Sequence, residues 1–156
     1  LSEVIVAAEF FKEGMKILEP HLPVLNENTL GKVIIGTPKG DIHSIGKNII
    51  ATMFKANGFE VHNLGVDVPA NAFINKVHEI KPQIVAMSAL LTVTFHSMKQ
   101  IVDALGKAQK NQKFKFLIGG AAVDEKVKEY VGAHYYGKDV IEAVTFAKKI
   151  VEELKE

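Results

Sequence analysis

From residue 31 onward, short apolar runs alternate along the chain with longer amphipathic stretches. The runs have the length of buried strands, and the stretches between them repeat apolar residues with the period of a helix. Proline or glycine separates most of these segments, as expected for turns. The pattern predicts strands at about 32–36, 59–63, 84–88, 114–118 and 134–136. It predicts helices at about 44–57, 70–80, 95–110, 124–131 and 139–154.

Regular alternation of strands and helices is typical of α/β proteins, in which helices cover both faces of a parallel sheet. Because crossover connections are right-handed, we expect a doubly wound five-stranded parallel sheet of the Rossmann-like or flavodoxin-like kind, with strand order 2-1-3-4-5. In this order the loops after the first and third strands meet at one edge of the sheet, where such folds bind ligands. The sequence therefore predicts where a binding site should lie.

A separate apolar stripe runs through residues 1–19 and predicts one amphipathic helix. The stripe consists of Val4, Ala8, Phe11, Met15 and Leu18. Pro20 and Pro23 should end this helix, and a polar linker should follow. We therefore divide the chain into residues 1–30, a helix with its linker, and residues 31–156, the α/β domain. Since the helical pattern is already present at Leu1, we expect the sequence to begin inside a larger protein.

Composition narrows the class of protein. At 156 residues the chain is long enough for one domain with its own core. It has no cysteine, which excludes disulfides, thiolate metal sites and cysteine nucleophiles. A net charge of +1 predicts no nucleic-acid partner and no binding to a membrane surface. With no signal peptide or apolar span visible, we expect a cytoplasmic location.

The most unusual stretch is the loop predicted between the first strand and the first helix of the domain, residues 36–46. Asp41 and His43 stand two residues apart in it. A carboxylate beside an imidazole forms an acid–base couple, or a metal-bound histidine with the group that orients it. A helix N-cap followed by a surface histidine would show the same spacing. The position of the loop at the expected ligand-binding edge favours a functional pair.

Nucleotide-binding motifs do not fit this loop. Between Gly40 and Gly46 there are five residues instead of the four of a phosphate-binding loop, and Asn48 stands where a magnesium-binding hydroxyl is required. The three-glycine dinucleotide pattern is absent. Ser88 replaces the aspartate that a phospho-receiver needs at the end of its third strand, and it lacks the flanking glycines of a hydrolase nucleophile.

Two further stretches are predicted at the same edge of the sheet. Residues 88–94 carry three hydroxyl groups, on Ser88, Thr92 and Thr94, among apolar residues. Gly119 and Gly120 follow the fourth strand and leave room for a close approach to the backbone. The hydroxyls also fit helix capping, and the glycines fit a tight turn. Together with the loop at 36–46, these stretches fit a bulky cofactor bound partly through His43.

The three stretches together resemble the signature of cobalamin-binding domains. The matching residues are Asp41-Ile42-His43-Ser44-Ile45-Gly46, Ser88-Ala89-Leu90 and Gly119-Gly120. They have the order and spacing found in the cobalamin-binding domain of methionine synthase and in the small corrinoid proteins of methyltransferase systems. The helix at 1–19 resembles the last helix of the helical cap that precedes this domain in those proteins.

The resemblance implies a role for several residues. His43 corresponds to the lower axial ligand of cobalt, which displaces the cofactor's own base, and Asp41 to the carboxylate hydrogen-bonded to it. Thr94 matches the third member of that relay, which is serine in methionine synthase. His43, Asp41 and Thr94 are therefore the candidate catalytic residues, and His43 is the metal ligand.

The same resemblance implies a binding pocket for cobalamin. Ser88, Leu90 and Thr92 correspond to residues that line the pocket for the displaced nucleotide tail, and the two glycines let the tail pass. One departure is His134, which stands where the family commonly has aspartate after Gly-Ala. The candidate cofactor-binding residues are Gly40, Asp41, Ile42, His43, Ser44, Ile45, Gly46, Ser88, Leu90, Thr92, Thr94, Gly119 and Gly120.

A protein of this family is expected to bind cobalamin base-off/His-on and to carry a methyl group through a Co(I)/methyl-Co(III) cycle. It would be the corrinoid subunit of a multi-component methyltransferase, without catalysis of its own. Its partners would be a donor-side and an acceptor-side methyltransferase, with a reductive activator. The alternatives are the cobalamin domain of a radical mutase and a cobalamin-dependent sensor.

Overall fold

The computed structural model describes residues 2–18, 20, 29–108 and 113–155. Strands and helices alternate along them as the sequence predicts. The strands are β1 (Lys32–Gly36), β2 (Glu60–Asn63), β3 (Ile84–Ser88), β4 (Lys115–Gly119) and β5 (Tyr135–Gly137). The helices are α1 (Ser2–Leu18), α2 (Ile45–Ala56), α3 (Ala70–Ile80), α4 (Thr94–Ala108), α5 (Glu125–Val131) and α6 (Val140–Glu153).

The five strands form one parallel sheet in the order β2-β1-β3-β4-β5. This confirms the predicted fold class and strand order. Because β1 pairs with β3 in the middle of the sheet, the loops that follow these two strands lie next to each other. The register pairs Gly36 with Met87 and Ser88 with Gly119, so β1, β3 and β4 end at nearly the same level.

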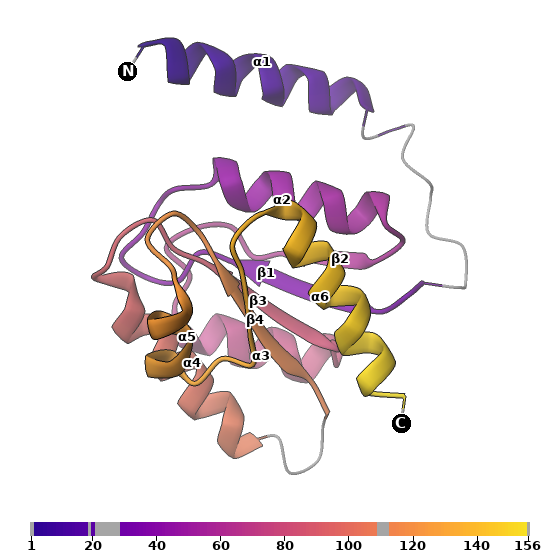
Figure 1. Cartoon of the computed structure of the whole chain (residues 1–156), viewed down its shortest axis with the longest axis vertical. Coiled ribbons are helices and arrows are strands. Elements are labelled where there is room, and N and C mark those ends of the chain that lie inside the picture. The colour runs from indigo at the N-terminus through magenta and orange to yellow at the C-terminus, as the bar shows by residue number, and fades with distance from the viewer. Residues whose placement is uncertain (1, 19, 21–28, 109–112, 156) are drawn as a thin grey trace.

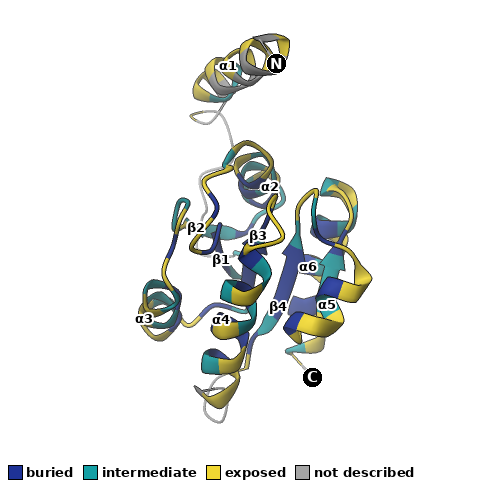
Figure 2. Ribbon diagram, turned by 90° about the vertical axis from the view of Figure 1, so that its left-hand side faces the viewer, coloured by how far each residue is buried: buried dark blue, intermediate teal, exposed yellow. Residues whose placement is uncertain are grey.

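Alternate residues of each strand contribute to two separate apolar cores, because successive side chains of a strand point to opposite faces. Ile34 and Val85 belong to the core shared with α3, α4 and α5. Val33 and Ala86 belong to the core shared with α2 and α6. Figure 1 shows these two layers of helices on the two faces of the sheet. The buried residues gather in the strands and on the helix sides that face them (Figure 2).

The predicted boundaries agree with the structure to within one or two residues. The fourth helix of the domain was expected to run to residue 110. Its described part, α4, ends at Ala108, and residues 109–112 lie outside the described residues. The short α5 begins one residue after Asp124, whose carboxylate accepts a hydrogen bond from the Val127 N–H and caps the helix.

The N-terminal helix α1 is set apart from the sheet in both views (Figures 1 and 2). Its apolar residues Val6, Phe10 and Ile17 are exposed. Of the five side chains in the predicted apolar stripe, only Met15 is among those described, and it is half-buried. Pro23 and most of the predicted linker also lie outside the description. The division at residue 30 and the likeness of α1 to a cap helix stay predictions.

None of the helices in the described part of the chain is long and apolar enough to cross a lipid bilayer.

Candidate functional site

The loop between β1 and α2 presents Asp41 and His43 at the edge where the strands end. Thr37 is fully buried, and its hydroxyl donates a hydrogen bond to the His43 carbonyl at 3.1 Å. This bond connects the beginning of the loop to its end. Ser44 occupies the N-cap position of α2 but makes no side-chain capping bond. Asp41 does not take that role either, since its carboxylate is turned toward the loop after β3. The interpretation of Asp41 as a helix cap is therefore wrong.

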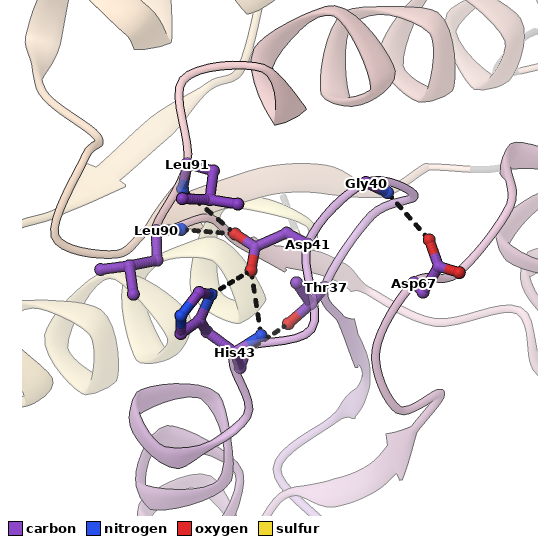
Figure 3. A network of polar contacts seen from close by, with 7 residues as sticks. All are labelled: Thr37, Gly40, Asp41, His43, Asp67, Leu90 and Leu91. Carbon is purple, nitrogen blue, oxygen red and sulfur yellow. Dashed lines mark hydrogen bonds and ion pairs between the residues drawn. The ribbon is translucent and has the colours of Figure 1, made fainter.

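The Asp41 carboxylate joins two loops (Figure 3). It is 1% exposed. Its Oδ1 atom accepts the His43 N–H at 2.9 Å and lies 2.7 Å from the His43 Nδ1. Its Oδ2 atom accepts the N–H groups of Leu90 and Leu91 at 2.7 and 3.2 Å. Asp41 thus connects the β1–α2 loop to the β3–α4 loop, the two loops that the strand order brings together.

The charge of Asp41 determines which His43 nitrogen carries a proton. Burial by itself would raise the pKa of the Asp41 carboxyl, but the hydrogen bonds from the backbone of His43 and Leu90, the His43 ring and the Leu91 backbone outweigh it and lower the pKa. Asp41 is therefore ionised at neutral pH and can only accept hydrogen bonds. The His43 Nδ1 must be the donor, and in the neutral imidazole the Nε2 atom keeps its lone pair for a ligand.

The His43 side chain is half exposed. Exposed apolar residues lie next to it in the sequence and in the β3–α4 loop, which Asp41 contacts. These are Ile42, Ile45, Leu90, Leu91 and Val93, each at least 40% exposed. Exposed apolar groups gathered around one polar group are typical of a ligand-binding surface. No group of three or more His, Cys, Asp or Glu side chains in the described part of the chain could hold a metal ion.

A cavity of about 410 Å³ lies against the same edge of the sheet. Its size is that of a small-molecule site. It is placed between the sheet and helices α2 and α6, and its wall combines apolar side chains with glycines. Among the residues that line it are Ile35, Gly46, Lys47, Ile50, Phe54, Ala86, Ser88, Leu117, Gly119, Gly120, Tyr136 and Gly137. The structure thus brings together Gly46, Ser88, Gly119 and Gly120, which the sequence predicted as cofactor-binding residues.

Two glycines of the cavity, Gly120 and Gly46, differ in the space that a side chain would find there. A Cβ atom on Gly120, whose φ is +118°, would lie 2.1 Å from the Ala89 carbonyl oxygen. Gly120 is therefore required by the contact between the β4–α5 and β3–α4 loops, whatever binds there. A Cβ atom on Gly46 would meet nothing within 4 Å. Gly46 is exposed, so a small side chain there would meet no other part of the described structure.

The predicted hydroxyl residues are placed differently from one another. Ser88 is half-buried in the wall of the cavity, whereas Thr92 is exposed on the β3–α4 loop. The Thr94 side chain is fully buried, and its Oγ1 atom has no hydrogen-bond partner. The places that a relay hydroxyl would take on Asp41 are occupied by the Leu90 and Leu91 amides. The relay through Thr94 is not formed in this structure and stays a prediction.

His134, just before β5, contacts the neighbouring strand β4 through Phe116. Its Nδ1 atom accepts the Phe116 N–H at 3.0 Å, and its ring stacks on Phe116. An aspartate oxygen at this position could accept the same hydrogen bond. Burial and the charge of Lys115 lower the pKa of His134, with Glu153 acting in the opposite direction. His134 is therefore held neutral, as an acceptor, and does not belong to the cofactor site.

Two residues of the site region were not identified as such from the sequence. Lys47 is 2% exposed and donates hydrogen bonds to the side chains of Asn48 and Asn63, each at 2.7 Å. Burial lowers the pKa of its ammonium group. The spacing of Lys47, Ala51 and Phe54 on one helical face could have revealed it. The other residue is Asp67, which contacts the Asp41 loop from the loop between β2 and α3.

A histidine paired with a buried carboxylate thus lies beside a cavity at the edge where a doubly wound sheet binds its ligands. Residues 31–145 match the B12 binding domain family. The chain belongs to this family, and its cofactor is cobalamin.

The relatives of the chain are corrinoid proteins. The trimethylamine corrinoid protein of Methanosarcina barkeri is 43% identical over 150 residues, which is 95% of this chain and 69% of the relative. The structure of the monomethylamine corrinoid protein of the same organism superposes with a TM-score of 0.80 at 29% identity, over 96% of this chain and 71% of that one. The methanol:cobalamin methyltransferase complex of Methanosarcina barkeri gives a TM-score of 0.75 at 31% identity, over 97% of this chain and 58% of the matched one.

Proposed function

We propose that this protein is a corrinoid methyl carrier in which His43 coordinates cobalt in place of the cofactor's own base. The observation that carries the proposal is the Asp41–His43 pair. The ionised carboxylate fixes the proton on Nδ1, and the half-exposed ring leaves Nε2 available. A corrin ring would bring nitrogen ligands of its own, and His43 would be the residue through which this chain holds the metal.

The surroundings of His43 fit the remainder of the cofactor. The exposed apolar side chains of Ile42, Ile45 and Leu90 can pack against the face of the macrocycle. The displaced nucleotide tail can enter the cavity beside Gly46 and Ser88, where the wall is apolar and a Cβ is missing. Thr92 is exposed on the β3–α4 loop, and its part in cofactor binding stays a prediction.

Bound through His43, cobalamin would supply the methyl-transfer chemistry. The chain's own part is to hold His43 in one orientation and to keep its proton on the side of Asp41. Leu90 and Leu91 assist, because their amides hold the carboxylate in place.

The partners of such a carrier are methyltransferases on the donor and acceptor sides, with a reductive activator to restore the reduced metal. The match to the methanol:cobalamin methyltransferase complex supports a methyltransferase partner. Two of the relatives are named as trimethylamine and monomethylamine corrinoid proteins, so a methylamine is the first class of methyl donor to test. They favour a methyl carrier over a radical mutase or a sensor.

The carrier function is tested by methyl transfer under single-turnover conditions. The cobalamin-loaded chain, reduced by a strong chemical reductant, is mixed with labelled trimethylamine, monomethylamine or methanol and the methyltransferase specific for each. We expect one label per chain with one of these pairs, and none without the methyltransferase. Multiple rapid turnovers by the chain alone would contradict the carrier role. No labelling with any pair, in a chain that binds cobalamin, would reject these donor classes.

A further inference from the structure

The loop that presents Asp41 is joined along its length to a second loop, the one between β2 and α3. The Thr37 N–H donates to the Gly65 carbonyl at 3.0 Å, the Val68 N–H donates to the Thr37 carbonyl at 3.0 Å, and the Lys39 N–H donates to the Val68 carbonyl at 2.9 Å. These bonds extend the pairing of β1 with β2 beyond the ends of the strands. They bring Asp67 beside Gly40 and Asp41.

Asp67 holds the chain at both ends of the Gly40–Asp41 dipeptide. Its Oδ1 atom accepts the Gly40 N–H at 2.9 Å, as Figure 3 shows. Its own N–H donates to the Asp41 carbonyl at 2.9 Å. To make both bonds, the Asp67 backbone adopts φ = +51°, a left-handed conformation that Asp and Asn tolerate better than other side chains.

Gly40 is where this restraint matters. Its φ is +97°, and a Cβ atom placed on it would meet nothing within 4 Å. A glycine in open surroundings has the widest choice of backbone conformations. The bond from its N–H to Asp67 is therefore a direct restraint on the residue immediately before Asp41.

We propose that Asp67 is a positioning residue for the cobalt ligand. The Asp41 carboxylate is held by the Leu90 and Leu91 amides, and its backbone is held by Asp67. Because the carboxylate and the backbone of Asp41 are both held, the carboxylate does not move with the rest of the loop. The His43 ring that contacts it therefore keeps one orientation. Asp67 thereby favours the state in which His43 coordinates the metal. This inference rests on the proposed function of His43.

Two substitutions separate the side chain from the backbone. Asp67→Gly tolerates the positive φ and removes the acceptor for the Gly40 N–H. Asp67→Asn keeps an Oδ1 acceptor and is the matched control. Hydrogen exchange of the Gly40, His43 and Leu90 amides is then measured in the 156-residue chain without cofactor. The last two amides are bound by the Asp41 carboxylate and not by Asp67.

Asp67→Gly should accelerate exchange at all three amides by about three- to tenfold, as for the loss of one hydrogen bond, and Asp67→Asn should leave them near the wild-type rates. In the cobalamin-loaded Co(II) form, Asp67→Gly should lower the fraction of cobalt bound by His43. Faster exchange at Gly40 alone would overturn the inference, because the restraint would end at that residue.

The cobalt measurement distinguishes this inference from the proposed function. A wild-type protein that shows no histidine nitrogen on cobalt would refute the ligand role of His43, whereas the exchange rates would still decide whether Asp67 orders the Asp41 loop. A wild-type protein with bound His43, together with an unchanged His43-bound fraction in Asp67→Gly, would refute only the role of Asp67.

Discussion

The Nδ1 atom of His43 lies 2.7 Å from the Oδ1 atom of Asp41. Because the carboxylate is buried, ionised and bound on its other oxygen by backbone amides, it can only act as an acceptor toward the imidazole. The pair therefore leaves Nε2, on the other side of the half-exposed ring, as the nitrogen that can bind a ligand.

Asp41→Asn should loosen the site without changing the fold. The carboxylate interacts with three backbone N–H groups and the His43 ring, and an amide oxygen cannot serve all of them. We expect the free energy of unfolding to fall by about 1–3 kcal/mol, since buried donors lose their acceptor. We expect cobalamin affinity to fall about 10–100-fold, as for other groups that orient a metal ligand.

Urea unfolding of the cofactor-free chain and a cobalamin titration followed by absorbance measure these two effects. Asp103→Asn is the matched control, because Asp103 forms an exposed ion pair with Lys99 on α4, outside both loops of the site. If Asp41→Asn unfolds at the same urea concentration as Asp103→Asn and binds cobalamin like the wild type, the role given to Asp41 is wrong.

Gly46 and Gly120 should respond in opposite ways to substitution. A Cβ on Gly46 meets open space in the first turn of α2, so Gly46→Ala should keep the stability or raise it by up to about 1 kcal/mol. Gly46→Leu should fill the cavity and abolish cobalamin binding in a folded protein. Gly120→Ala places its Cβ against the Ala89 backbone and should destabilise the protein even without cofactor, by at least about 1–3 kcal/mol.

Thermal unfolding and cobalamin titration of the three variants measure this contrast. Normal cobalamin binding by a folded Gly46→Leu variant would show that the nucleotide tail does not use the cavity. A stable Gly120→Ala variant would show that the β4–α5 and β3–α4 loops do not need their close contact.

His134 should make stability depend on pH. Its pKa is lowered from 6.5 in the folded protein, so protonation favours the unfolded chain. Its contribution to stability is complete above about pH 6.5 and is lost as the pH falls toward and through the folded-state pKa. His134→Asn retains an acceptor for the Phe116 N–H and does not titrate, and the wild type should lose stability relative to it on acidification.

Urea unfolding between pH 5 and 8 measures this difference. His134→Leu is a second comparison, because it loses both the acceptor and the titration. It should be less stable than His134→Asn at every pH, by about 1–3 kcal/mol for the unpaired Phe116 amide. Parallel pH profiles for the wild type and His134→Asn would contradict the assignment of a lowered pKa.

The fold could be predicted from the sequence because its signals are local. The apolar run Val33–Ile35 and the helical pattern of residues 47–54 each specify one element, and the right-handed crossover rule then orders the strands. The Asp41–His43 pair was predictable for the same reason, since the two residues are close in the sequence. Lys47 itself was missed because a lysine is rarely buried.

The remaining features of the site depend on contacts between distant segments. The partners of the Asp41 carboxylate on the β3–α4 loop are backbone amides, which every residue except proline possesses, so no residue type marks them. The unpaired Thr94 hydroxyl and the hydrogen bonds of Asp67 to Gly40 and Asp41 likewise depend on how loops pack after the sheet has formed. Gly120 lines the cavity, but the close approach of the Ala89 backbone, which leaves no room for a Cβ there, was not visible in the sequence.

The most direct test of the account is the electron paramagnetic resonance spectrum of the Co(II) form, prepared with ¹⁵N-histidine-labelled protein and unlabelled cobalamin. Coordination by His43 predicts that each cobalt line is split into a doublet by one ¹⁵N nucleus, and that His43→Ala loses this splitting. A triplet splitting, from the ¹⁴N of the cofactor's own base, would contradict the claim that His43 replaces that base.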